Sequence, residues 1–530
     1  MPTLEWIGKS KVVNHHLDVP YHVLERKYSY DEKGQHAEDN GSENMIIHGD
    51  NLIALKSLLP QYEGKIKCIY IDPPYNTGNE NWVYNDNVND PRIKKWLGEV
   101  VGKEGEDLSR HDKWLCMMYP RLRLLQKLLA EDGVIFISID DNEQANLKHI
   151  CDEIFGVNNF IAQMIWQKRT SPDARRKISV GHEYILVYVK NASGLFKEFN
   201  KLAWDEQSAK SYKNPDNDPR GPWISTDCTA QAGHGTKNQF YTMVTPAGRE
   251  INLPDNLCWR YTKERMDEEI KKGRIWFGAD GKGVPRKKTY LYESEGRNLW
   301  TWWSNTEVGH TQEATKELTK IFGNSALFDY PKPVRLIQRI IQIATNSNAI
   351  ILDSFSGSGT TAHAVLNANK ADNGNRRFIL IEMEDYADTI TAERVKRVIK
   401  GYGEDKKKVP GTGGNFSYYE LGSPIFKGDN LNEEIGEDGI RKYVYFTETK
   451  QLISRKKDEE PKFMGIHMDT AYYFHYEKDS ITTLNRDFLH TVKTKASGYV
   501  IYADLCTLSE RELEKWHITF KKIPRDISKI

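Results

Sequence analysis

The feature that most constrains this fold is an alternation of strand and helix patterns that stops and later resumes. Between residues 45 and 160, apolar runs typical of strands (MIIHGD, KCIYID, VIFISID) alternate with helical patterns such as NLIALKSLLPQY and PRLRLLQKLL. The alternation returns after about residue 311 with KPVRLIQRIIQIA, AIILD and FILIE. This pattern predicts an α/β fold in which helices cover a largely parallel sheet, and the two halves of that sheet lie far apart in the sequence.

The chain is too long for one ordinary domain, since its 530 residues can bury several cores. The stretch between the two sheet halves is rich in Trp, Tyr, Arg, Lys, Gly and Pro and has no long periodic helix, so we expect an insert there. The predicted regions are an N-terminal extension (1–43), the first half of the sheet domain (44–191), the insert (192–310), the second half (311–410) and a C-terminal α+β domain (411–530).

Composition excludes several classes of protein. Lys plus Arg and Asp plus Glu both number 75, so any surface for a polyanion must be a local patch. The six cysteines form no C-x-x-C pair, which disfavours both a metal site and a disulfide framework. The N-terminus lacks a signal-peptide pattern, and no run approaches the about 18 apolar residues of a membrane span. We therefore expect a cytoplasmic protein without a metal ion.

The tetrapeptide Asp72-Pro73-Pro74-Tyr75 directly follows the predicted strand KCIYI, and strand ends are where open α/β sheets bind ligands. A carboxylate at Asp72 and the carbonyl of Pro73 could accept both hydrogens of an exocyclic base amine, which is otherwise a poor nucleophile. The two prolines stiffen the loop, and Tyr75 offers a flat face for a flipped-out base. The alternative is an ordinary surface turn.

A glycine-rich turn, DSFSGSGTT at residues 353–361, joins another predicted strand to a helix. It lacks the GK[ST] of a phosphate-binding P-loop and the third glycine of a dinucleotide fold, so it suits a nucleoside with an amino-acid tail. Glu382 ends the next strand, where an acid typically binds ribose hydroxyls, although it could simply be solvated. Asp50 could approach the cofactor or only cap a helix, and Lys332-Pro333 could pack on the cofactor or only begin a helix.

The order of these motifs, with DPPY first, then the insert, then KP and FSGSG, resembles the beta class of amino DNA methyltransferases. Longer stretches such as HGDNLIALKSLL, YIDPPYNTGN, DGVIFISIDDNE and LDSFSGSGTTAHAV are similar to the modification (Mod) subunit of type III restriction-modification systems. The resemblance implies a Rossmann-like S-adenosylmethionine-dependent fold with circularly permuted motifs, methylation of adenine N6 in double-stranded DNA, a homodimer and a helicase-nuclease restriction partner.

By this resemblance the catalytic residues are Asp72, Pro73, Pro74 and Tyr75. The cofactor-binding residues that it implies are Asp50, Lys332, Pro333, Asp353, Phe355, Gly357, Gly359, Thr360 and Glu382. It assigns dimerisation or partner docking to the C-terminal domain.

Candidate DNA contacts come from cationic runs and from the loop after DPPY. They are Asn76, Lys168, Arg169, Arg286 and Lys287, although such charge runs often lie on a solvated face. Cytosine N4 remains an alternative target, because that amine presents the same two hydrogens. A DNA-binding specificity subunit that serves a nuclease partner is the alternative from another functional class.

Overall fold

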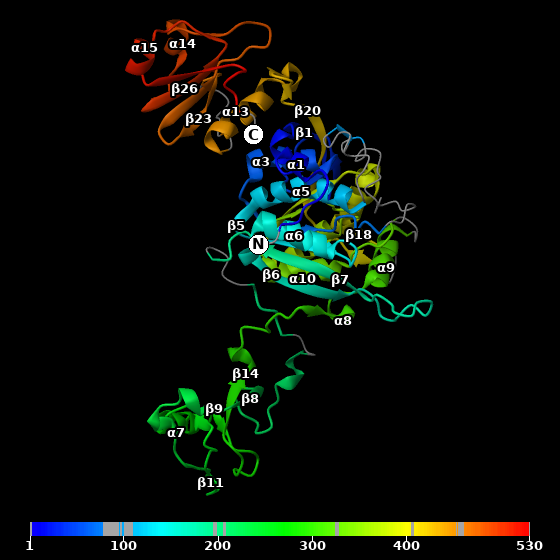
Figure 1. Cartoon of the computed structure of the whole chain (residues 1–530), viewed down its shortest axis with the longest axis vertical. Helices are drawn as coiled ribbons and strands as arrows, with labels where there is room; N and C mark the ends of the chain where they lie inside the picture. The colour runs from blue at the N-terminus through cyan, green and yellow to red at the C-terminus, as the bar shows by residue number, and fades with distance from the viewer. Residues whose placement is uncertain are drawn as a thin grey trace. The chain divides into compact units, whose positions relative to one another are not determined.

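The computed structural model describes residues 3–77, 110–193, 199–204, 208–323, 328–403, 408–451 and 460–528, with a few isolated positions besides. The chain divides into two compact units, and each is described by itself. The main unit combines residues 1–199 with 300–530, and the insert unit comprises residues 200–299 (Figure 1). No helix in the described ranges is both long and apolar enough to cross a bilayer.

An eleven-stranded mixed sheet forms the centre of the main unit. In spatial order its strands are β15 (Trp302–Trp303), β6 (Phe160–Gln167), β7 (His182–Val189), β5 (Leu129–Ile139), β4 (Ile66–Ile71), β16 (Ile350–Asp353), β17 (Arg377–Glu382), β3 (Met45–His48), β20 (Asn415–Pro424), β1 (His22–Asp31) and β2 (Gly34–His36). The two halves of the alternation meet where β4 pairs in parallel with β16, with Ile69 opposite Leu352.

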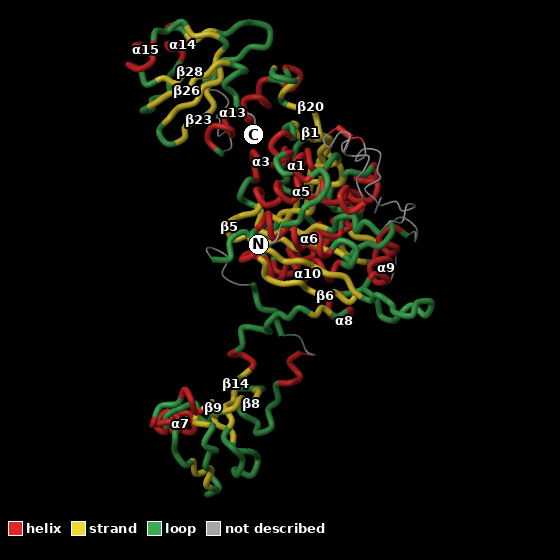
Figure 2. The backbone as a smooth tube through the Cα atoms, in the orientation of Figure 1, coloured by secondary structure: helices red, strands yellow, loops and turns green. Residues whose placement is uncertain are grey.

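From β5 to β20 in the spatial order, each strand is parallel to the next one, as the sequence predicts. Nearer the edges the sheet differs from that expectation, because β7 is antiparallel to both β5 and β6, and β1 is antiparallel to both β20 and β2. Helices accompany the strands throughout this unit (Figure 2). The helices α3 (Asn51–Tyr62), α5 (Arg110–Leu128) and α6 (Gln144–Phe155) share one apolar core with strands β4 and β5. The helices α8 (Asn305–Val308), α9 (Thr311–Phe322), α10 (Val334–Ala344), α11 (Thr360–Asp372) and α12 (Glu393–Lys400) follow the insert.

The predicted N-terminal extension is wrong as a separate region, because residues 3–36 are part of the sheet unit. Two short helices, α1 (Lys9–Val12) and α2 (His15–Asp18), lie in this segment, and Val12 at the end of α1 is wholly buried in the main core. Strand β1 pairs with β20 along its length, for example Tyr30 with Phe416. The polar composition hid this strand, since only a few of its side chains face the core.

The boundary predicted at residue 411 also shifts, because β20 pairs in parallel with β3 of the large sheet. A separate four-stranded sheet follows, made of β23 (Phe463–His467), β24 (Thr470–Phe474), β26 (Gly498–Ala503) and β28 (Ile518–Lys522). The helices of this region are α13 (Glu437–Thr449), α14 (Arg486–Thr491) and α15 (Glu510–Lys515). Three short strand pairs also lie in this part of the chain: β18 (Gly401–Tyr402) with β19 (Val409–Pro410), β21 (Phe426–Lys427) with β22 (Asn430–Leu431), and β25 (Thr483–Leu484) with β27 (Leu505–Cys506).

The insert unit has its own small core, in which Trp259 and Met266 are fully buried. Its largest sheet joins β13 (Ile275–Trp276), β14 (Arg286–Tyr290) and β8 (Trp223–Asp227). Two short pairs and one helix complete it: β9 (Thr229–Gln231) with β12 (Leu257–Trp259), β10 (Met243–Val244) with β11 (Glu250–Ile251), and α7 (Lys263–Lys271).

Candidate active site

A cavity of about 660 Å³ lies where the loops after β4 and β16 meet. The first loop contributes Asp72, Pro73, Pro74 and Tyr75, and the glycine-rich turn contributes most of residues 353–361. Because β4 and β16 are parallel neighbours, their carboxyl ends open on the same edge of the sheet. The fold therefore brings together two motifs that are about 280 residues apart in the sequence.

The DPPY loop is fixed from behind by the ends of α5 and α6. The indole Nε1 of Trp114 donates to the carbonyl of Pro74 at 2.7 Å. Asn76 adopts a left-handed backbone with φ 57°, and its side-chain amide donates to Glu143 Oε1 at 2.5 Å. Asn76 is wholly buried. Asn76 thus supports the DPPY loop from inside the protein, whereas the sequence suggested a contact with DNA.

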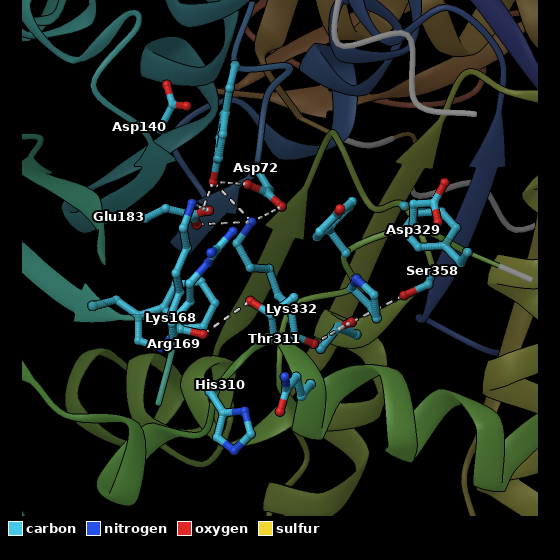
Figure 3. Close-up of a pocket in the computed structure, with 18 of the residues that line it drawn as sticks. Asp72, Asp140, Lys168, Arg169, Glu183, His310, Thr311, Asp329, Lys332 and Ser358 are labelled. Carbon is cyan, nitrogen blue, oxygen red and sulfur yellow. Dashed lines mark hydrogen bonds and ion pairs between the residues drawn. The ribbon is translucent and has the colours of Figure 1, made fainter. Parts of the chain in front are cut away.

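Asp72 is held by two donors at the mouth of this loop (Figure 3). The Tyr75 hydroxyl donates to Asp72 Oδ1 at 2.7 Å, and Lys332 Nζ donates to Asp72 Oδ2 at 2.6 Å. Burial raises the pKa of Asp72 and Lys332 offsets this only in part, so the carboxyl binds a proton more readily than an ordinary Asp.

Lys332 connects the two motifs. Its side chain lies on Asp72, whereas the sequence suggested packing against the cofactor. Its backbone carbonyl accepts a hydrogen bond from Thr360 Oγ1 of the glycine-rich turn at 3.3 Å. Lys332 therefore ties the Asp72 carboxylate to the second loop, and Pro333 beside it serves as the N-cap of α10.

Glu183, on β7, completes the polar cluster and was missed in the sequence. Its carboxylate accepts from Lys168 Nζ at 2.9 Å and lies 3.5 Å from Lys332 Nζ and 3.1 Å from the Tyr75 hydroxyl. Burial opposes ionisation, but Lys332 and Lys168 outweigh it and the pKa of Glu183 is lowered. The available signal was a single acid in the apolar strand HEYILVYV. Lys168, suggested as a DNA contact, is part of this cluster.

The glycine-rich turn is held by carboxylates on both sides. Asp353 accepts from Thr361 Oγ1 at 2.5 Å, and burial raises the pKa of Asp353 to about 7. Glu382 Oε2 accepts the backbone N–H of Gly357 at 2.7 Å, so this acid shapes the turn itself. Gly359 has φ 80°, and a Cβ there would lie 3.0 Å from the carbonyl oxygen of Thr391. A side chain at this position would therefore clash with backbone.

The turn fits the nucleoside and amino-acid groups of S-adenosylmethionine. The buried hydroxyls of Ser354 and Ser356 have no hydrogen-bond partner among the described residues, and Ser356 lines the cavity beside Phe355. Unpaired buried hydroxyls are costly unless a polar ligand or water satisfies them. An aromatic ring next to such donors suits a flat base with polar substituents.

Four of the suggested cofactor residues are not among the described residues that line the cavity: Asp50, Pro333, Gly359 and Glu382. Asp50 is the N-cap of α3, because its Oδ1 accepts from Leu52 N at 2.8 Å and from Ile53 N at 3.3 Å. The structure thus places Asp50 in the capping role that the sequence left open.

The remaining suggested DNA contacts fall in different units. Arg169 is exposed and lines the cavity, as do Arg175 and Arg176 of the same loop between β6 and β7. Arg286 and Lys287 lie on β14 of the insert unit. There Arg286 Nη1 pairs with Asp227 at 2.5 Å, and Lys287 Nζ lies 3.1 Å from the Tyr261 hydroxyl.

The fold and this site define an α/β enzyme with its ligand cavity at the carboxyl ends of parallel strands. The chain belongs to the DNA methylase family, whose model matches residues 66–393.

Curated relatives extend the match. The type III restriction-modification enzyme StyLTI Mod subunit of Salmonella typhimurium is 35% identical over 419 residues, which are 73% of this chain and 62% of that protein. The type III EcoPI Mod subunit of Escherichia phage P1 is 34% identical over 72% of this chain and 64% of its own length. The type II methyltransferase M.KpnI of Klebsiella pneumoniae is 32% identical over 67% of this chain and 84% of its own length. The match thus spans less than two thirds of the type III Mod relatives.

Proposed function

We propose that this protein is a site-specific DNA methyltransferase that transfers a methyl group from S-adenosylmethionine to the N6 of a flipped-out adenine. The observation that carries the proposal is the shared cavity, which places Asp72 and Tyr75 opposite the turn that contains Phe355 and Ser356. Membership of the DNA methylase family supports the reaction class. The choice of adenine follows the resemblance to type III Mod subunits.

The residues of the catalytic loop suit this chemistry. S-adenosylmethionine supplies an electrophilic methyl group when it is bound. The Asp72 carboxylate and the Pro73 carbonyl accept the two N–H bonds of the amine, which directs the nitrogen lone pair at the methyl group. Asp72 then takes the proton that the methylated amine releases, and its raised pKa favours that step. The Tyr75 ring stacks on the flipped base.

Two surfaces are proposed for DNA. Arg169 and Arg176 line the catalytic cavity and are exposed, so they suit phosphates beside the flipped nucleotide. The insert unit, with Arg286 and Lys287, is proposed as the target-recognition region that reads the sequence. Loss of a phosphate contact weakens binding for all sequences, whereas loss of a base contact relaxes specificity at one position.

We further propose that the protein is the modification subunit of a type III restriction-modification system. The identity to the StyLTI and EcoPI Mod subunits supports this assignment. A homodimer and a helicase-nuclease restriction partner belong to the same proposal, with the C-terminal domain as the docking region. All six cysteines are free, which fits a cytoplasmic enzyme.

The test is transfer of labelled methyl from S-adenosylmethionine to unmodified plasmid DNA, followed by nucleoside digestion and mass analysis. The expected product is N6-methyladenine, and it should vanish with Asp72→Ala. N4-methylcytosine would transfer the assignment to the other base. DNA and cofactor binding without any incorporation would instead support a specificity subunit that serves a nuclease partner.

A further inference from the structure

We infer that Glu183 is a positioning residue for methyl transfer: it receives the hydrogen bond of the Tyr75 hydroxyl when Asp72 takes the proton from the methylated amine. Tyr75 is the link between the two acids. This inference rests on the proposed function and adds a residue to its machinery.

The geometry starts from the single hydrogen of the Tyr75 hydroxyl. The hydroxyl oxygen lies 2.7 Å from Asp72 Oδ1 and 3.1 Å from Glu183 Oε2, so two carboxylates compete for one donor. Lys332 Nζ donates to the same hydroxyl oxygen at 3.0 Å. A rotation about one C–O bond is enough to redirect the hydroxyl from Asp72 to Glu183, and no side chain has to move.

The proton transfer balances with these groups alone. One N–H bond of the methylated amine breaks, and an O–H bond forms on Asp72 Oδ1. Protonation makes Oδ1 a donor and a much weaker acceptor than the carboxylate, so the Tyr75 hydroxyl is better satisfied by the ionised Glu183. With the hydroxyl turned to Glu183, Asp72 donates to the Tyr75 oxygen and Tyr75 donates to Glu183. Every donor keeps an acceptor, and Glu183 remains ionised throughout.

The charges of the cluster fit two acids with different tasks. Asp72 and Glu183 face the ammonium groups of Lys332 and Lys168, so the buried charges balance while both acids are ionised. Removing the Glu183 charge would leave one ammonium without its partner. The titratable groups that face the pair come from several packed elements: Tyr75 from the same loop, Tyr70 from β4, Asp140 after β5, Lys168 after β6, Lys332 before α10 and Asp353 at the end of β16.

The directions of the two pKa shifts agree with this division. Burial raises the pKa of Asp72 despite Lys332, so Asp72 is the acid that accepts the proton. Burial also acts on Glu183, but two lysines outweigh it and the pKa of Glu183 is lowered. Glu183 therefore stays ionised and can accept a hydrogen bond from the Tyr75 hydroxyl.

The test is a double-variant cycle on the full chain. Glu183→Gln, Tyr75→Phe and the double variant are compared in single-turnover methyl transfer with cofactor and DNA in excess. Gln keeps the volume but loses the charge, and its amide oxygen is drawn to the neighbouring lysines. We expect each single variant to slow transfer about tenfold, and the double variant to be no slower than Tyr75→Phe. Independent, multiplicative losses would show that Glu183 does not act through Tyr75 and would overturn the inference.

The chain offers a matched control in Glu153. This residue also accepts from a tyrosine hydroxyl, Tyr119 at 2.8 Å, and from a lysine, Lys9 at 3.0 Å, but it is not among the described residues that line the cavity. Glu153→Gln should leave the transfer rate unchanged. Thermal unfolding of both Gln variants shows whether a lost rate merely reflects lost folding.

A second readout needs no catalysis. With 3-fluorotyrosine in place of Tyr75, the ¹⁹F resonance of the free protein should titrate as Asp72 takes up a proton. Glu183→Gln should move this midpoint down by about one pH unit, since both the negative charge and the acceptor for the turned hydroxyl are lost. An unmoved midpoint would overturn the inference even if the protein methylates DNA. A shifted midpoint in a protein that transfers no methyl would leave this inference standing and overturn the proposed function instead.

Discussion

Two buried clusters in this molecule use the same three residue types and behave in opposite ways. In the cavity of the main unit, Asp72 accepts from Lys332 and Tyr75. In the insert unit, Asp218 Oδ2 accepts from Lys288 Nζ at 2.8 Å and from the Tyr290 hydroxyl at 2.7 Å. Yet the pKa of Asp72 is raised, whereas that of Asp218 lies well below the ordinary range.

The difference comes from burial and from a guanidinium. Asp218 also binds Arg220 through two hydrogen bonds, from Nε at 2.8 Å and Nη2 at 2.7 Å, and these are the main cause of its lowered pKa. For Asp72, burial is the main cause of the raised pKa, and the negative charge of Glu183 adds to it. A carboxylate paired with a guanidinium stays ionised and stabilises the fold. A buried carboxylate beside a second acid takes up a proton more readily.

The largest expected effect is on chemistry. Asp72→Asn should slow methyl transfer on the order of 10³-fold, because the amide can neither take the proton nor replace the negative charge. Single-turnover transfer measures this loss. Cofactor binding and thermal unfolding should stay close to those of the unmodified protein, and a rate within tenfold would contradict the role of Asp72.

The corresponding change in the insert should act on stability. Asp218→Asn removes the buried carboxylate that pairs with Lys288 and Arg220, although Lys288 keeps its pair with Asp216, and should destabilise the insert unit by about 3 kcal/mol. Unfolding of the insert unit in urea, with proteolytic cleavage of the insert as the probe, measures this loss. Asp227→Asn is the control, since its exposed pair with Arg286 should contribute little. An equal loss of stability in Asp218→Asn and Asp227→Asn would contradict the structural role of the Asp218 cluster.

The two tyrosines sharpen the comparison. Tyr290→Phe should lower the free energy of unfolding by about 1 kcal/mol, because one buried hydrogen bond to Asp218 is lost. It should not change the single-turnover rate at saturating DNA. Tyr75→Phe should do the reverse, with slower transfer and little change in unfolding. A loss of stability in Tyr75→Phe with an unchanged transfer rate would mean that Tyr75 is only structural.

The smallest expected effect is a difference in pH dependence. Methyl transfer should decline as pH falls through the pKa of Asp72, which lies above the ordinary value of 3.8. The stability that Asp218 supplies is fully present above 3.8 and is lost only as pH falls below that value towards its lowered folded pKa. Transfer rates and urea unfolding between pH 4.5 and about 8 compare the two. Parallel decline of both would contradict the assignment.

The positions of the DPPY loop and the glycine-rich turn could be predicted from the sequence because their signals are local. A strand pattern followed directly by DPPY or by DSFSGSGTT places each loop at a strand end, and parallel order then brings Asp72 and Asp353 to one edge. The contact between Lys332 and Asp72 was not predicted, because a KP dipeptide before a helix does not tell which group the lysine side chain will reach.

What the sequence could not predict depends on pairing between distant segments. Glu183 becomes part of the site only through the antiparallel pairing of β7 with β5 and β6, which helps bring it to Lys168. From the sequence, Asn76 is a polar loop residue like its neighbours. Its left-handed backbone and its buried hydrogen bond to Glu143 depend on packing against α5 and α6. Strand β1 needs β20 as a partner nearly 400 residues away.

The insert closes on itself at its base. The backbone N–H of Leu202 donates to the carbonyl of Arg297 at 3.1 Å, and that of Arg297 returns a bond to Leu202 at 2.8 Å. The two ends of the insert unit are thus paired with each other. Residues 200–299 could therefore be exchanged for another insert without a change in the length of the main unit's own connections. With the insert as the proposed target-recognition region, recombination between related genes at these two points would change the recognised DNA sequence and leave the cavity of the main unit unchanged.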